Sequence, residues 1–117
     1  MQSWNLHEID LPDGSRSPVV LESDHAARAV LIGLTPDQEL SDHEVKEHAF
    51  LLVVDGSIRV EAAGEVVDAG PGTLFAFEPE ERRAVASADG ARLLLLLAPW
   101  PAPGHYRGDE HAAPTAR

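Results

Sequence analysis

The stretch PDQELSDHEVKEHAFLLVVDG, residues 36–56, decides the fold of this chain. It begins as a strand that carries His43, passes a short polar break, and continues as a fully apolar strand over 49–54. Asp55 and Gly56 follow, and these residue types tolerate the positive φ that tight turns between antiparallel strands require. The stretch therefore predicts a β-hairpin that turns at Asp55 and Gly56 and returns over residues 58–62.

Similar runs recur along the rest of the chain. Each is short, apolar or alternating, and bounded by Gly, Pro or Asp, at a spacing of about eight to twelve residues that is typical of antiparallel sandwiches and barrels. No amphipathic helix competes with them. We expect an all-β domain with strands at residues 4–9, 18–21, 28–34, 40–45, 49–54, 58–62, 65–67, 73–77, 83–87 and 91–98.

Length and composition indicate a single folded domain. The chain has 117 residues, of which 44 % are hydrophobic and 25 % charged, and this is a globular composition. After residue 98, closely spaced prolines remove backbone donors from any sheet and favour an extended strap, which Trp100 would pin to the body. We expect a barrel domain over residues 1–106 and a flexible tail over 107–117.

The net charge of the chain limits the classes of partner that it is expected to bind. The formal net charge of −11 repels phosphate backbones and anionic lipids, so we expect no nucleic-acid or membrane partner. The longest aliphatic run, residues 93–97, is far shorter than the roughly 20 residues of a spanning helix. The first residues show no secretion signal, and the chain has no cysteine. We therefore expect a cytoplasmic protein.

The stretch at residues 36–56 and a second stretch at residues 70–86 resemble the two motifs of small single-domain cupins, a jelly-roll barrel family. When Gly56 is placed at the last glycine of the first cupin motif, the histidine positions fall on His43 and Val45 and the glutamate position on Ala49. The stretch GPGTLFAFEPEERRAVA is similar to the second motif, with Arg83 or the following alanine at its histidine position. The resemblance implies an antiparallel jelly-roll barrel. It also implies a homodimer, in which an N-terminal strand and an apolar sheet face pack against a second copy.

The resemblance raises the question of a metal. Cupins usually hold a divalent ion between two or three imidazoles and a carboxylate on one inward face, which leaves an open position for substrate. In this chain Val45 and Ala49 offer no lone pairs at two of those positions. We therefore expect no cofactor. The alternative is a divalent transition metal held by displaced ligands, for which the candidates are His43, Glu47 and His48.

The polar residues around the break admit a simpler interpretation. Adjacent strand residues point to opposite faces, so at most one of Glu47 and His48 faces inward. Charged clusters of this kind usually line a wet surface, and we interpret both as solvated turn residues. His105 lies in the proline strap, which could fold over an opening of the barrel, but tail histidines are more often solvated.

Strand alternation also indicates an interior pocket. His43 shares a face with Val45, and one of the adjacent Arg82 and Arg83 should point toward the barrel mouth. A guanidinium there could hold a ligand carboxylate by two parallel hydrogen bonds, whereas the simpler interpretation is a rim loop of mutually neutralising charges. The pocket residues that we expect are His43, Val45, Ala49, Phe75, Phe77, Arg83 and Val85.

Three functions are compatible with this sequence. The first is binding of a small organic ligand by a cupin-like module without an intact metal cage and without catalysis. The second is a metal-dependent cupin enzyme, an oxygenase or isomerase of a small organic acid that uses His43. The third is a structural or regulatory interaction protein whose sheet surface is the working part.

Overall fold

A computed structural model of the protein describes residues 1–11, 18–24 and 26–105, and for residues 41–43 it describes the backbone alone. The expected tail 107–117 lies outside the described residues. The described part contains the strands β1 (Val19–Ser23), β2 (Arg28–Leu34), β3 (Gln38–His43), β4 (His48–Gly56), β5 (Ile58–Ala62), β6 (Glu65–Ala69), β7 (Leu74–Phe77), β8 (Arg83–Ser87) and β9 (Ala91–Ala98). In this part of the chain no helix is long and apolar enough to cross a membrane.

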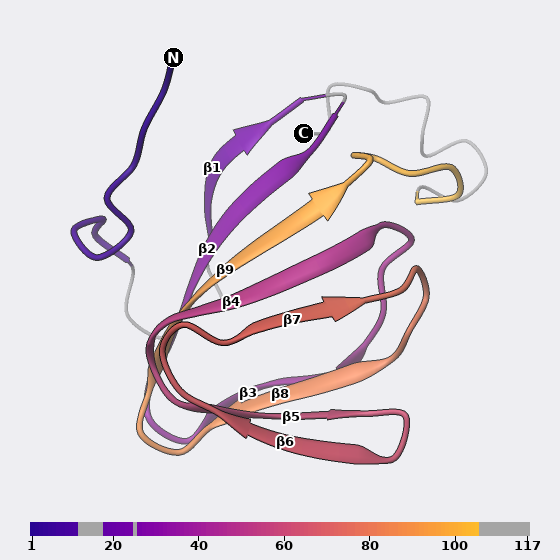
Figure 1. Cartoon of the computed structure of the whole chain (residues 1–117). Coiled ribbons are helices and arrows are strands. Elements are labelled where there is room, and N and C mark those ends of the chain that lie inside the picture. Colours follow the sequence, from indigo (N-terminus) through magenta and orange to yellow (C-terminus); the bar gives the residue numbers. More distant parts are fainter. Residues whose placement is uncertain (12–17, 25, 106–117) are drawn as a thin grey trace.

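The strands form two antiparallel sheets. The five-stranded sheet has the order β1-β2-β9-β4-β7, and the four-stranded sheet has the order β3-β8-β5-β6. Figure 1 shows the two sheets facing each other as the walls of a flattened barrel. Among the described strands, the consecutive pairs that are hydrogen-bonded to each other are β1 with β2 and β5 with β6. Every other connection joins strands that are not neighbours in a sheet. The predicted all-β jelly roll is confirmed.

One predicted strand is wrong. Residues 4–9 form a turn instead of a strand, with the Glu8 backbone N–H donating to the Asn5 carbonyl at 3.0 Å. The carbonyls of Leu6 and Ile9 accept hydrogen bonds from Nη1 of Arg92 at 2.7 and 2.8 Å. A side chain of β9 therefore takes the backbone acceptors that a neighbouring strand would have used.

The predicted hairpin at Asp55 and Gly56 is also wrong. β4 pairs with β7 and β9, whereas β5 pairs with β6 and β8, so Gly56 is a corner at which the chain leaves one sheet for the other. The two-residue hairpin lies next along the chain, between β5 and β6. There Ala63 and Gly64 have φ of 53° and 80°, the positive values that a type I′ turn requires at both central positions.

The core lies between the two sheets and follows from strand alternation. In β4, Ala49, Leu51 and Val53 are buried while the residues between them are more exposed. The opposite sheet contributes buried residues such as Val60 and Val85. Full burial of one large aliphatic side chain stabilises the fold by about 1.5–3 kcal/mol. The packed interior therefore fixes which side chains can reach the ends of the barrel.

Candidate functional site

Charged residues that are not part of the apolar core lie together at one end of the barrel. β3 and β7 end there and β4 and β8 begin there, because Ala49 pairs with Phe77 and His43 pairs with Arg83. β9 ends there too, since His48 pairs with Ala98. We call this end of the barrel the mouth. The segment that follows β9, residues 99–105, is called the strap.

Arg83 is buried at the mouth. Only 3 % of its surface is exposed, and its guanidinium carbon lies 4.8 Å from the centre of the Phe77 ring. Its Nη1 has no hydrogen-bond partner within the described part of the chain. Burial lowers the pKa of the Arg83 guanidinium below its ordinary value, and the charge of Glu81 partly opposes that shift. This side chain is therefore a desolvated cation with unused donor capacity.

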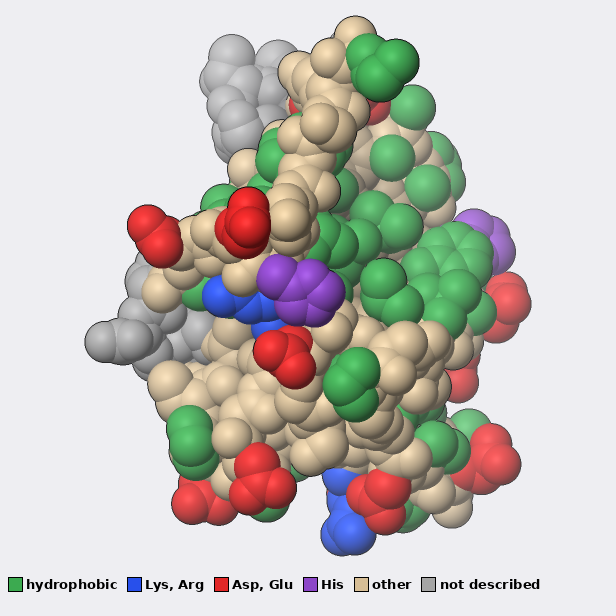
Figure 2. Space-filling model, turned by 60° about the vertical axis from the view of Figure 1, so that its left-hand side comes forward, with side chains coloured by type: hydrophobic (Ala, Val, Ile, Leu, Met, Phe, Trp, Pro, Cys, Tyr) green, Lys and Arg blue, Asp and Glu red, His purple; other side chains and the backbone are tan. Residues whose placement is uncertain are grey.

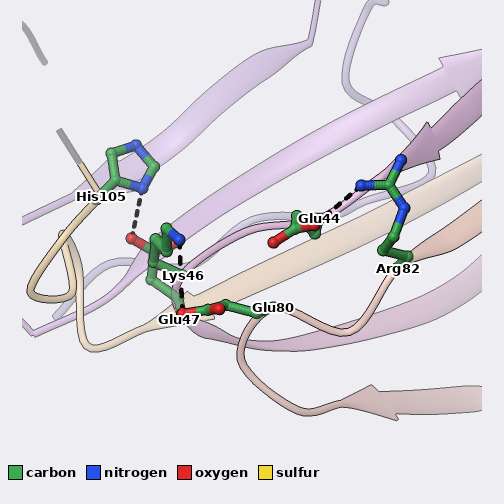
Figure 3. Close-up of polar contacts among 6 residues, drawn as sticks. All are labelled: Glu44, Lys46, Glu47, Glu80, Arg82 and His105. Carbon is green, nitrogen blue, oxygen red and sulfur yellow. Dashed lines mark hydrogen bonds and ion pairs between the residues drawn. The ribbon is translucent and has the colours of Figure 1, made fainter. Parts of the chain in front are cut away.

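Arg82, the residue just before β8, is exposed and points the other way. Its Nη1 donates to Oε1 of Glu44 at 3.0 Å on the exposed surface (Figure 3). Lys46 and Glu80 form a second rim pair, 3.5 Å apart. The interpretation as mutually neutralising rim charges therefore holds for Arg82. It does not describe Arg83.

Glu47 is fully buried, so the expectation that it is a solvated turn residue is wrong. Its Oε2 accepts hydrogen bonds from the backbone N–H of Ala102 at 3.0 Å and from Nδ1 of His105 at 2.7 Å (Figure 3). The strap therefore folds back over the mouth and covers the carboxylate. Glu47 Oε1 has no partner among the described residues. His48 stays exposed, as predicted, with Nδ1 3.9 Å from Glu78.

The strap is anchored by Trp100. This residue is 5 % exposed, as the predicted pinning role requires. The guanidinium of Arg28 lies 4.6 Å from the ring centre, and the ring of His105 meets it edge-on at 4.5 Å. The indole Nε1 is buried and has no partner among the described residues. His105 is thus a structural contact of the mouth, whereas the sequence favoured a solvated tail histidine.

The apolar residues expected to line the pocket lie in or against the core. Ala49, Phe77 and Val85 belong to the buried cluster, and Val45 and Phe75 pack against it. The Phe75 and Phe77 rings stack with their centres 6.3 Å apart. The side chain of His43 lies outside the described residues, although its backbone is paired with Arg83.

The described side chains do not fit a metal cage. Ala49 is fully buried among apolar residues, and Val45 packs against the same cluster. Among the residues described, no group of three His, Asp or Glu side chains is placed to share an ion. The buried carboxylate of Glu47 is engaged by the strap. No step that depends on a metal is therefore derived for this site.

Comparison with known families gives one match. The AraC-like ligand binding domain family matches residues 25–98, which is more than half of the chain and includes all of β2 to β9. No curated protein matches the sequence.

Solved structures support the fold. An RmlC-like cupin from Shewanella frigidimarina is similar at 22 % identity and a TM-score of 0.70, covering 81 % of this chain and 83 % of that one. An RmlC-like cupin from Desulfovibrio desulfuricans is 21 % identical with a TM-score of 0.72, covering 85 % and 97 %. The Cnp3 cupin domain of Schizosaccharomyces pombe is 12 % identical with a TM-score of 0.73, covering 83 % and 73 %. At these identities the likeness concerns the fold alone.

Proposed function

The chain belongs to the AraC-like ligand binding domain family, and from this premise we propose that it binds a small organic acid at the mouth of its barrel. Arg83 holds the carboxylate of the ligand. The apolar part of the ligand contacts side chains at the near end of the core, drawn from His43, Val45, Ala49, Phe75, Phe77 and Val85. The module binds without an intact metal cage and does not itself catalyse a reaction.

The burial of Arg83 carries this proposal. A buried guanidinium without a charged partner is costly, and the cost falls when an anion accepts its hydrogen bonds. Nη1 of Arg83 has no partner among the described residues, and a guanidinium offers a fork of donors that matches a carboxylate. Phe77 packs against this guanidinium, whose carbon lies 4.8 Å from the ring centre.

The test is titration calorimetry with a panel of small monocarboxylic acids. Hydrogen bonds to charged groups contribute about 1.5–3 kcal/mol, so Arg83→Met should weaken the best acid by at least about 10-fold. Arg82→Met removes the same charge from the exposed rim and is the matched control. Equal losses in both variants would contradict the proposal. If Arg83→Met does not fold, Arg83→Lys keeps the charge without the fork and should still lose affinity.

The metal-dependent enzyme is the second candidate. One observation favours it. At the mouth, Oε1 of the buried Glu47 carboxylate has no partner among the described residues, and Glu47 lies in the short connection that follows His43 at the end of β3. Elemental analysis of protein purified without chelators separates the two candidates. Stoichiometric iron, manganese, nickel or zinc that disappears in His43→Ala would show a metal site at His43 and favour the enzyme candidate. A metal-free protein that still binds acids would favour the first.

We also propose that the protein is a homodimer. The outer face of the five-stranded sheet carries exposed apolar side chains from three strands, namely Phe50, Leu74 and Leu96. Figure 2 shows hydrophobic side chains gathered beside the N-terminal segment on this side of the molecule. A second copy would cover them. The same surface would be the working part of an interaction protein, the third candidate.

A further inference from the structure

We propose that the ligand is a hydroxy monocarboxylic acid, held at two points, with its carboxylate on Arg83 and its hydroxyl on Glu47. This inference rests on the proposed function and adds the chemical class of the ligand. It follows from three of the buried polar side-chain atoms that have no partner among the described residues, and these three belong to the mouth and the strap.

The first atom is Oε1 of Glu47. The two oxygens of this fully buried carboxylate are treated unequally, because Oε2 accepts from both Ala102 and His105 while Oε1 accepts from nothing described. A buried acceptor without a donor costs about 1–3 kcal/mol, more when it is charged. Such a group in a folded protein calls for an explanation, and a ligand donor is one.

The second atom, Nη1 of Arg83, belongs to the same end of the barrel. The Arg83 guanidinium lies over Phe77, and Phe77 pairs with Ala49. Glu47 lies two residues before Ala49, just ahead of β4, and both residues are fully buried. The mouth therefore offers one buried donor cation and one buried acceptor anion.

The charges of these two groups limit the ligand. One guanidinium neutralises one carboxylate, and a second carboxylate would be buried beside Glu47 without a partner. At the rim, Glu44 and Glu80 are paired with Arg82 and Lys46, so the rim supplies no spare cation from these pairs, and the whole chain has a net charge of −11. A di- or tricarboxylic acid is therefore disfavoured. A monoacid with a hydrogen-bond donor fits both groups.

The third atom, Nε1 of Trp100, favours a hydroxyl group over an ammonium group as the hydrogen-bond donor of the ligand. Nε1 of Trp100 is a buried donor without a described partner, and it lies in the strap that also contacts Glu47. A hydroxyl can donate to Glu47 and accept from an indole N–H, whereas an ammonium group can only donate. An amino acid would therefore leave Trp100 unsatisfied.

The experiment compares pairs of acids that differ by one hydroxyl, such as lactate with propionate and mandelate with phenylacetate. Binding to the wild-type protein is measured by calorimetry. The hydroxy acid should bind at least about 10-fold more tightly than its partner, the range expected for a hydrogen bond to a charged group. Glu47→Gln should reduce this preference to less than about threefold while the deoxy acid keeps its affinity.

Two controls separate ligand contact from a structural role of Glu47. His105→Gln disturbs the strap but leaves Glu47 Oε1 in place, so the preference should persist. In the wild type, the NMR resonance of the Glu47 carboxyl carbon should shift with the hydroxy acid and not with the deoxy acid. This second readout decides the matter even if Glu47→Gln does not fold.

The outcomes distinguish this inference from the proposed function. If deoxy acids bind as tightly as hydroxy acids and Arg83→Met abolishes both, the two-point ligand is wrong and the acid-binding function stands. Equal loss of the preference in Glu47→Gln and His105→Gln, with no shift at the Glu47 carboxyl, also overturns it. If the wild type binds no monoacid of either kind, the proposed function itself fails.

Discussion

Arg83 and Glu47 are both charged and both buried, yet the fold satisfies them to different degrees. The strap supplies two donors to one oxygen of Glu47. Arg83 receives an aromatic face from Phe77 but no described acceptor for Nη1. Natural proteins usually pair such groups, and unpaired ones concentrate at functional positions. The contrast is the reason to place the ligand carboxylate at Arg83, whereas Glu47 holds the strap with Oε2 and has only Oε1 left for the ligand.

The contact between His105 and Glu47 should be a measurable part of the folding free energy. His105→Ala removes one of the two donors to a fully buried carboxylate, which should lower the free energy of unfolding by about 1–3 kcal/mol. Urea denaturation at neutral pH measures it. His7→Ala, at an exposed position in the N-terminal segment, should change stability by less than about 0.5 kcal/mol. Similar losses in the two variants would mean that the strap contact does not stabilise the fold.

A pH dependence is expected at the exposed pair of Arg59 and Asp68. Nε of Arg59 donates to Oδ1 of Asp68 at 2.9 Å, and this holds the pKa of the carboxyl below its ordinary 3.8. Because the folded pKa is the lower one, the stabilisation is present above the ordinary value and is lost as pH falls through the folded pKa. The pair is exposed, so its effect on stability is small.

The measurement for this pair is an NMR titration of the Asp68 carboxyl. It should titrate below pH 3.8 in the wild type and at higher pH in Arg59→Gln. Arg82→Gln removes an equal charge that pairs with Glu44 and should leave the titration unchanged. A titration of Asp68 that does not respond to Arg59→Gln would show that the pair does not form in solution.

At the scale of elements, Gly56 makes the crossing from β4 to β5 possible. Its φ is 81°, and a Cβ at this position would lie 2.2 Å from the carbonyl oxygen of Gly90. Gly56→Ala should therefore combine the cost of a left-handed backbone, about 1–2 kcal/mol, with an overpacking cost of about 1–3 kcal/mol. Thermal or urea unfolding measures the loss.

Gly64 is the matched control for that substitution. Its φ is 80°, but a Cβ at this position would have no described neighbour within 4 Å, so Gly64→Ala should cost only the backbone contribution of about 1–2 kcal/mol. If Gly56→Ala lowers the free energy of unfolding no more than Gly64→Ala does, the backbone at Gly90 moves aside at little cost. The difference between the two variants isolates the close approach from the backbone conformation.

The positions of the strands could be predicted because alternation and turn residues are local signals. β2, β5, β8 and β9 occupy the predicted ranges to the residue. Which strands pair is a non-local property, so an Asp-Gly corner between sheets looks the same in sequence as a hairpin. Residues 4–9 alternate like a strand, but Arg92 captures their carbonyls from a distant part of the chain.

The site was predictable to a similar extent. Alternation predicts that one of Arg82 and Arg83 points inward, and in the structure Arg83 is buried whereas Arg82 is exposed. The burial of Glu47 could not be predicted, because its partners lie in the strap and the bond to Ala102 spans 55 residues of sequence. The sequence left open whether the proline-rich segment folds over an opening of the barrel, and the structure shows that it returns to the mouth and brings His105 with it.

At the scale of the whole molecule, the five-stranded sheet is apolar on both faces. The run of leucines in β9 gives one set of side chains to the core and another, including Leu94 and Leu96, to the outer face. Phe50 is 40 % exposed, Leu74 59 % and Leu96 36 %. The N-terminal segment covers part of this face, since Leu11 packs over Gly33. The remaining apolar surface is of the kind that marks an interaction site.

We therefore expect a dimer that depends on this outer face. Sedimentation equilibrium of the wild type should give about twice the chain mass of 12.6 kDa. Leu96→Glu places a charge at the centre of the face and should give a monomer, because an unpaired buried charge opposes association. Val66→Glu, on the exposed edge strand β6 of the other sheet, adds the same charge and should leave the dimer intact. A monomeric wild type, or a Leu96→Glu variant that remains dimeric, would show that a second copy does not cover this sheet.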